Sequence, residues 1–78
     1  MEIKVLGPGC MNCKKLHQVV IDTLAENNMD ADVQKVEDIA EIVKAGILST
    51  PALMVNGKVV SSGRLLSKQQ VLELISKA

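Results

Sequence analysis

The chain has 78 residues, of which 47% are hydrophobic and none is Phe, Tyr or Trp, and nine basic residues balance nine acidic ones. This length predicts a single domain, residues 1–78, with a thin aliphatic core. A neutral balance gives no electrostatic footprint for nucleic acid or an anionic membrane, and no segment has the ~18 apolar residues of a membrane span. The start, MEIKVLG, lacks the long apolar segment of a signal peptide. We therefore expect a cytoplasmic monomer that binds neither nucleic acid nor membranes.

The N-terminal part of the chain predicts a strand followed by a helix. Residues 2–6, EIKVL, alternate and carry β-branched side chains, which is typical of a strand. The GPG at 7–9 ends this strand, because proline fixes its own φ and glycine permits a sharp bend. From residue 11 to about residue 27, apolar residues recur at helical spacing. They include Leu16, Val20 and Leu24.

The middle of the chain predicts a second strand and a short helix. Residues 30–36, DADVQKV, alternate imperfectly and indicate the strand. Asp38 is suited to cap a helix that runs through Ala45 and ends at Gly46. We expect this helix to bury three apolar side chains: Ile39, Ile42 and Val43.

The C-terminal part predicts a β-hairpin and a last helix. PALMV (51–55) and KVVS (58–61) flank Asn56-Gly57, the strongest short hairpin signal. Ser67 followed by Gln70 forms a capping box for a helix through about residue 76. Its expected buried residues are Val71, Leu74 and Ile75.

The predicted order is therefore β-α-β-α-β-β-α, an α/β fold with a mixed four-stranded sheet and three helices. Helical connections join the first strand to the second and the second to the third. Such crossovers predict parallel strand pairs with right-handed connections. The hairpin then adds one antiparallel strand at the edge.

Cys10 and Cys13 are the only cysteines, and they form a CxxC motif where the first strand meets the first helix. Backbone N–H groups and the positive end of a helix favour a thiolate at Cys10. Cys13 lies nearly one turn further along and can attack a mixed disulfide on Cys10. This placement predicts an asymmetric, reversible disulfide pair, with Cys10 as nucleophile and Cys13 as resolving thiol.

Other functions of the motif remain open at this point. Soft thiolates also bind Cu(I), as in small heavy-metal-associated modules and metallochaperones. Those domains run β-α-β-β-α-β, which is not the order predicted here, and two thiols leave a zinc site short of its usual four ligands. A pure interaction module is the third alternative. We expect no bound metal or cofactor, and we assign no role to His17 or Arg64.

Three segments together resemble the thioredoxin/glutaredoxin superfamily: CMNC at the strand-to-helix turn, STP before the third strand, and the VNGKVV hairpin. The chain is most similar to small thioredoxin-like, redox-active disulfide proteins of archaea and bacteria. The resemblance implies a thioredoxin-like fold and a thiol–disulfide oxidoreductase acting through Cys10 and Cys13. Its substrates are then protein or small-thiol disulfides, and a separate reductant restores the dithiol. The resemblance also implies that Thr50-Pro51 is cis, faces the cysteines and helps to bind the substrate.

The chain departs from thioredoxins near this motif. Gly9 stands where thioredoxins usually have Trp, and Met11-Asn12 replaces Gly-Pro between the cysteines. Lys4 stands where thioredoxins commonly bury an acid. The segment SSGR replaces the Gly-Gly segment that helps glutaredoxins to hold glutathione.

Overall fold

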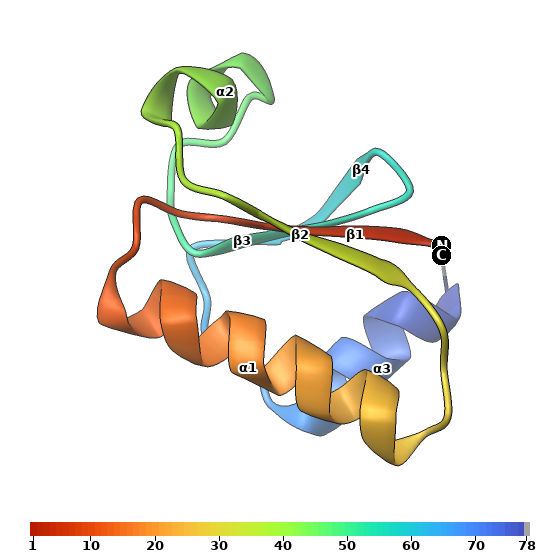
Figure 1. Cartoon of the computed structure of the whole chain (residues 1–78). Coiled ribbons are helices and arrows are strands. Elements are labelled where there is room, and N and C mark those ends of the chain that lie inside the picture. The colour runs from red at the N-terminus through yellow and green to blue at the C-terminus, as the bar shows by residue number, and fades with distance from the viewer. Residues whose placement is uncertain (78) are drawn as a thin grey trace.

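The computed structural model describes residues 1–77, which form a four-stranded sheet and three helices in the predicted order (Figure 1). The elements are β1 (Glu2–Leu6), α1 (Met11–Glu26), β2 (Asp32–Val36), α2 (Ile39–Lys44), β3 (Ala52–Val55), β4 (Lys58–Ser62) and α3 (Lys68–Lys77). α1 and α3 cover one face of the sheet, and α2 lies on the other side, near one end. None of the helices within residues 1–77 is both long and apolar enough to cross a membrane. The predicted fold class is confirmed.

The sheet has the strand order β2-β1-β3-β4. β1 pairs with β2 in parallel and with β3 in antiparallel orientation, and β3 and β4 form the predicted hairpin. Asn56 and Gly57 both have positive φ values, 52° and 82°, as a tight two-residue hairpin turn requires. Asn56 also accepts a hydrogen bond from the Glu2 backbone N–H through Oδ1 at 2.9 Å, so the hairpin is held to the start of β1.

The predicted parallel pairing of the second and third strands is wrong. β3 instead runs antiparallel beside β1, with Ala52 opposite Leu6. The connection, residues 37–51, stays at the end of the sheet where β1 and β2 finish, because Ile42 and Ile47 pack with Leu6 at the end of β1. Ala52 belongs to the same cluster, so β3 starts at this end and runs back along β1.

The main core lies between the sheet and the pair α1 and α3. Its fully buried side chains come from all these layers and include Ile3, Val5, Leu16, Val20, Leu53, Val55, Val71 and Ile75. A smaller cluster, Leu6, Ile42, Ile47 and Ala52, holds α2 against the other face. The smaller cluster lies at the end of the sheet where β1 and β2 finish and β3 starts.

α2 is less buried than its sequence predicts. Ile42 is 4% exposed, but Ile39 and Val43 are 63% and 61% exposed, so the prediction that all three face inward is wrong. A helix of fewer than two turns rests on the sheet through one side chain. The other two apolar side chains of α2 therefore face water.

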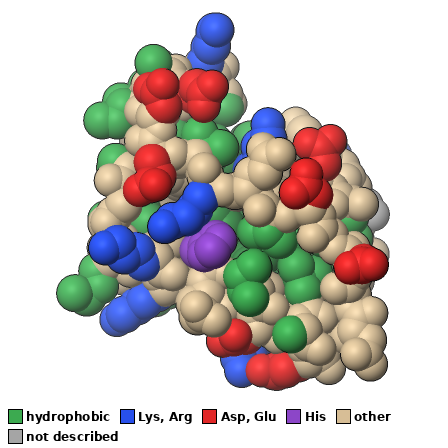
Figure 2. Space-filling view, viewed as in Figure 1, with side chains coloured by type: hydrophobic (Ala, Val, Ile, Leu, Met, Phe, Trp, Pro, Cys, Tyr) green, Lys and Arg blue, Asp and Glu red, His purple; other side chains and the backbone are tan. Residues whose placement is uncertain are grey.

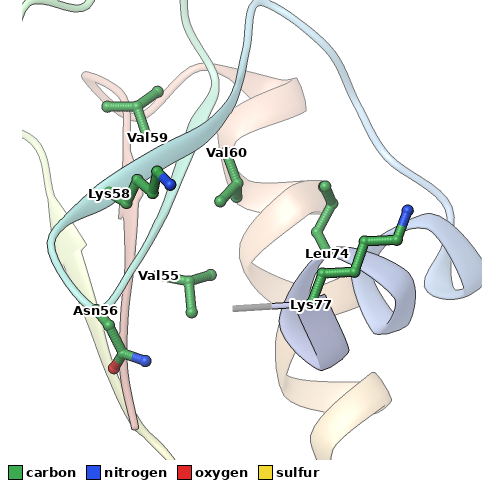
Figure 3. A pocket seen from close by; sticks show the side chains of 7 residues that line it. All are labelled: Val55, Asn56, Lys58, Val59, Val60, Leu74 and Lys77. Atoms are coloured by element: carbon green, nitrogen blue, oxygen red, sulfur yellow. The ribbon is translucent and has the colours of Figure 1, made fainter.

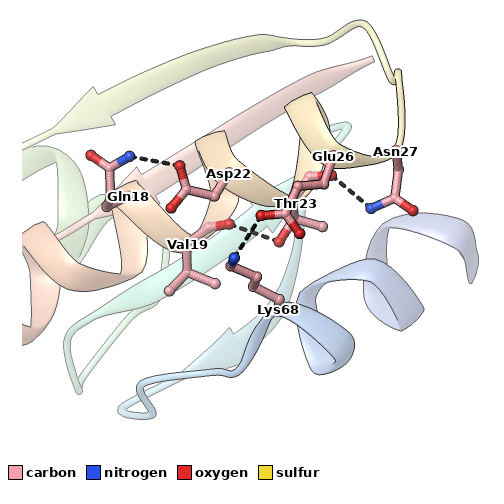
Figure 4. A network of polar contacts seen from close by, with 7 residues as sticks. All are labelled: Gln18, Val19, Asp22, Thr23, Glu26, Asn27 and Lys68. Atoms are coloured by element: carbon pink, nitrogen blue, oxygen red, sulfur yellow. Dashed lines mark hydrogen bonds and ion pairs between the residues drawn. The ribbon is translucent and has the colours of Figure 1, made fainter.

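Most polar contacts toward the C-terminal end of α1 lie within that helix, and one ion pair connects it to α3 (Figure 4). The buried Thr23 donates its hydroxyl hydrogen to the Val19 carbonyl at 2.7 Å, and Asn27 Nδ2 donates to the Thr23 carbonyl at 2.8 Å. Lys68 Nζ lies 2.6 Å from Glu26 Oε2. The hydrogen bond and charge of Glu26 raise the pKa of Lys68 above its ordinary value. This exposed pair contributes little to stability. Because the pKa of Lys68 is raised, its contribution is present at neutral pH and is lost as strongly alkaline pH deprotonates the lysine.

The predicted capping box at α3 is present and gives a testable stability prediction. The Gln70 backbone N–H donates to Ser67 Oγ at 3.2 Å, and the Ser67 N–H donates to Gln70 Oε1 at 2.9 Å. Ser67→Ala is expected to lower the free energy of unfolding by about 1 kcal/mol, because it removes the side-chain oxygen that accepts the Gln70 N–H. Urea denaturation measures this loss. Ser76→Ala, within the same helix, is the control and should be neutral or slightly stabilising; equal effects of both substitutions would contradict the capping role.

Candidate active site

The CxxC pair lies where the chain leaves β1 and enters α1. Cys10 is the N-cap residue of α1, with extended backbone angles, φ −65° and ψ 164°. Its Sγ accepts a hydrogen bond from the Cys13 backbone N–H at 3.2 Å. Cys10 and Cys13 are joined by a disulfide, with their Cα atoms 5.0 Å apart. The first turn of α1 therefore brings the two sulfurs together, as the spacing predicts.

The two cysteines differ strongly in exposure. Cys10 is exposed, whereas Cys13 is 2% exposed and belongs to the interior. The Cys10 sulfur thus lies at the helix end, where N–H groups favour negative charge. Cys13 is shielded from a partner in solution but remains in reach of Cys10.

Gly7 lies directly against Cys13. A Cβ atom added to Gly7 would be 2.9 Å from Cys13 Cβ and closer still to Cys13 Sγ. The Gly7 N–H donates to the Val36 carbonyl at 2.8 Å, which holds this position at the end of β2. The absence of a side chain at Gly7 therefore makes room for the buried sulfur.

The segment before β3 reaches the same place. The Thr50–Pro51 peptide bond is cis, as the resemblance implies. Thr50 is half-buried. The Cβ atom that would meet Cys13 if added to Gly7 would also lie 3.7 Å from the Thr50 Cβ. Pro51 is buried, and its carbonyl accepts a hydrogen bond from the Gly63 N–H at 2.9 Å. Cys13 and Thr50 thus both lie close to Gly7, and the folding of distant segments assembles the site.

Two residues of this region were not predicted from the sequence. One is Gly7, because the sequence GPG does not show that the Cys13 side chain packs against it. The other is Glu37. A Cβ atom added to Gly9, the residue before Cys10, would lie 3.0 Å from Glu37 Oε2. Within residues 1–77, His, Cys, Asp and Glu side chains do not gather in groups of three or more that would hold a metal ion.

A pocket of about 380 Å³ lies far from the cysteines, between the hairpin and α3 (Figure 3). Its lining residues are Val55, Asn56, Lys58, Val59, Val60, Leu74 and Lys77. Val55 lies opposite Ile3 near the beginning of β1, whereas Cys10 follows the end of that strand. The pocket is thus separated from the sulfurs by the length of the sheet and plays no part in their chemistry.

Comparison with known proteins agrees with this geometry. The chain matches the family described as thioredoxin domain over residues 1–76. It is 32% identical over 76 residues to a thioredoxin of Methanothermobacter thermautotrophicus, which covers 97% of this chain and 99% of the relative. It is 28% identical over 71 residues to a thioredoxin of Methanocaldococcus jannaschii, covering 91% of this chain and 81% of the relative. With its fold and its disulfide-forming CxxC pair, the chain belongs to the thioredoxin family and is a thiol–disulfide oxidoreductase.

Proposed function

We propose that Cys10 is the attacking thiol and Cys13 the resolving thiol in the reduction of protein or small-thiol disulfides. The Cys10 thiolate attacks one sulfur of the substrate disulfide, that S–S bond breaks, and the departing sulfur takes up a proton. Cys13, losing its proton, then attacks the Cys10 sulfur of the mixed disulfide. The second substrate sulfur leaves as a thiol, and Cys10 and Cys13 end as the disulfide. Two electrons pass from the protein to the substrate.

The observation that carries this assignment is the contrast between an exposed Cys10 at the helix N-cap and a Cys13 that is 2% exposed. The first attack needs an accessible thiolate, and the helix end with its N–H groups favours one. The second attack is intramolecular and needs no access from solvent. Burial of Cys13 is therefore compatible with the resolving role and unsuited to the first attack.

The Thr50–Pro51 segment is the proposed substrate-binding element. Thr50 and Cys13 both lie close to Gly7, at the end of the sheet where Cys10 is exposed. An extended substrate segment can pair with the backbone of Thr50 by strand addition, which would present its disulfide to Cys10.

A monomer of one domain, residues 1–78, suffices for this chemistry. It needs no cofactor and no contact with nucleic acid or membranes. An external reductant must return the disulfide to the dithiol in each cycle. A cytoplasmic location is consistent with this role, because thiol-reducing systems operate there.

Alkylation of the reduced protein by iodoacetamide, followed by mass analysis of each cysteine, tests the assignment. Cys10 is expected to react first at neutral pH, and its rate should rise with pH, because the helix N-terminus favours the reactive thiolate over the thiol. The Cys10→Ser variant serves as the control, because it reports the reactivity of Cys13 alone. Faster modification of Cys13 than of Cys10 at neutral pH would reverse the assigned roles.

A further inference from the structure

The pocket between the β3–β4 hairpin and α3 has no part in the thiol chemistry (Figure 3). Its volume of about 380 Å³ falls within the roughly 300 to 1,000 Å³ of pockets that hold a small molecule. It lies toward the beginning of β1, whereas the thiols follow the end of that strand. A ligand can therefore occupy this pocket without reaching the sulfurs, and the lining residues decide which ligand fits.

The deeper part of the pocket is apolar. Val55 is the most buried of the lining residues, at 1% exposed. Val60 from β4 and Leu74 from α3 are half-buried and pack against the main core without being fully covered. Figure 3 shows Val55 and Val60 on the hairpin side of the pocket and Leu74 on the helix side. An apolar chain between hairpin and helix would remove these side chains from water, which is favourable.

Two lysines line the same pocket, one from each side. Lys58 belongs to β4 and Lys77 to α3, and both are exposed. Figure 3 shows the Lys58 side chain extending from β4 toward α3. The ion pair within residues 1–77 joins Lys68 to Glu26, so neither pocket lysine has an acidic partner among these residues. The lining therefore carries two unpaired positive charges and no negative charge.

The lack of an acidic lining residue distinguishes this pocket from its neighbours. Figure 2 shows basic and acidic side chains interspersed over one face of the molecule. The pocket that contains Lys4 and Lys44 is also lined by Glu41, and the pocket that contains Arg64 is also lined by Glu73. Between the hairpin and α3, a carboxylate that balances the two lysines must come from a ligand.

Asn56 adds an oriented hydrogen-bond donor at the hairpin end of the pocket. Its Oδ1 accepts the Glu2 backbone N–H at 2.9 Å, which identifies the other side-chain atom, Nδ2, as the donor. Within residues 1–77, Nδ2 makes no hydrogen bond. Amide N–H and ammonium groups both donate to carboxylate oxygens, so this donor suits the same ligand group as the lysines.

The combination of an apolar interior and a positive rim selects an amphipathic anion. An inorganic anion would leave the apolar side chains in contact with water. A neutral apolar molecule would make no use of the lysine charges. A carboxylate with an alkyl chain matches both parts of the pocket, and a single molecule of this kind fits the available volume.

We infer that this pocket binds a medium-chain aliphatic carboxylate. The carboxylate lies near Lys58, Lys77 and the Asn56 amide, and the alkyl chain lies over Val55 and Leu74. This site is separate from the thiol pair, and its occupancy depends neither on the redox state of the protein nor on the proposed roles of the cysteines.

Titration of the uniformly ¹⁵N-labelled, oxidised protein with sodium octanoate, followed by backbone amide NMR, tests the inference. Saturable shifts are expected at residues 55–60 and 74–77, with little change at residues 9–13. Lys58→Gln/Lys77→Gln should weaken octanoate binding about fivefold, since each exposed ion pair contributes modestly. The same variant should bind 1-octanol as wild type does, because the alcohol carries no charge. Acetate, which lacks the chain, should bind at least about tenfold more weakly than octanoate.

Lys4→Gln/Lys44→Gln is the matched control, because these two lysines line a different pocket. It should bind octanoate with wild-type affinity. Absence of saturable shifts with octanoate, or shifts centred on Lys4 and Lys44, would overturn the inference. So would an octanoate affinity that is unchanged in Lys58→Gln/Lys77→Gln, or acetate binding as tight as octanoate binding. None of these outcomes bears on the thiol mechanism, which the cysteine variants test separately.

Discussion

Cys10→Ser is expected to abolish disulfide reduction, whereas Cys13→Ser is expected to leave the protein covalently attached to its substrate. In the proposed mechanism the thiolate of the exposed residue Cys10 makes the first attack, and a serine hydroxyl does not replace a thiolate there. The loss of turnover should be on the order of a thousandfold or more. Without Cys13, the mixed disulfide on Cys10 has no internal thiol to resolve it. Turnover and mixed disulfides are measured with a model protein disulfide, by activity assay, non-reducing electrophoresis and mass analysis.

The double variant Cys10→Ser/Cys13→Ser is the control for non-specific attachment and should capture nothing. Added dithiothreitol should release the substrate from the Cys13→Ser protein, because the link is a disulfide. Trapping by Cys10→Ser in place of Cys13→Ser would show that the roles are exchanged. If neither single variant traps substrate, the mixed-disulfide mechanism is wrong.

Gly7→Ala is expected to lower the free energy of unfolding of the reduced protein by about 1 to 3 kcal/mol, because the new methyl group overpacks the space beside Cys13. Gly7 is not among the residues with positive φ in the described chain, so its backbone suits alanine. At such a position, replacing glycine by alanine would otherwise raise the free energy of unfolding by about 0.4 to 1 kcal/mol. The contact with the buried Cys13 therefore decides whether Gly7→Ala stabilises or destabilises the protein. Urea denaturation under reducing conditions gives the stability, and iodoacetamide rates show whether Cys13 has moved.

Two controls separate this contact from a general effect of alanine. Gly57→Ala places a methyl group in open space at φ +82°, so it should cost stability through the backbone alone and leave thiol reactivity unchanged. In a Cys13→Ala background the sulfur is absent, and the cost of Gly7→Ala should fall by about 1 kcal/mol or more. An equal cost in both backgrounds would contradict the role of Gly7 in accommodating the Cys13 sulfur.

Much of the fold follows from local signals in the sequence. The alternation in β1, the Asn56-Gly57 turn, the Ser67-Gln70 box and the Asp38 cap each specify a local backbone geometry, and the structure contains all of them. The position of Cys10 at the start of α1 follows in the same way, because GPG must end the strand before the helix begins. These features depend on neighbouring residues and need no tertiary information.

The remaining features depend on distant segments. The pairing of β3 with β1 depends on contacts between residues far apart in the sequence, such as Leu6 with Ala52, which local patterns do not contain. The exposure of Ile39 and Val43 depends on how α2 rests on the sheet, whereas the apolar pattern alone predicts burial. The approach of Thr50 to Gly7 and Cys13 arises only when the segment before β3 meets the end of β1.

The equilibrium between the dithiol and disulfide forms of Cys10 and Cys13 tests the central claim most directly. The protein is incubated in glutathione or dithiothreitol buffers of graded potential, quenched by alkylation and weighed by mass spectrometry. We predict one reversible two-electron transition within the monomer, reached equally from both forms, in which about 30 mV changes the ratio of the two forms tenfold. Thiols that stay free under mild oxidant, or disulfides that form only between molecules, would contradict the assignment of this pair as the redox centre.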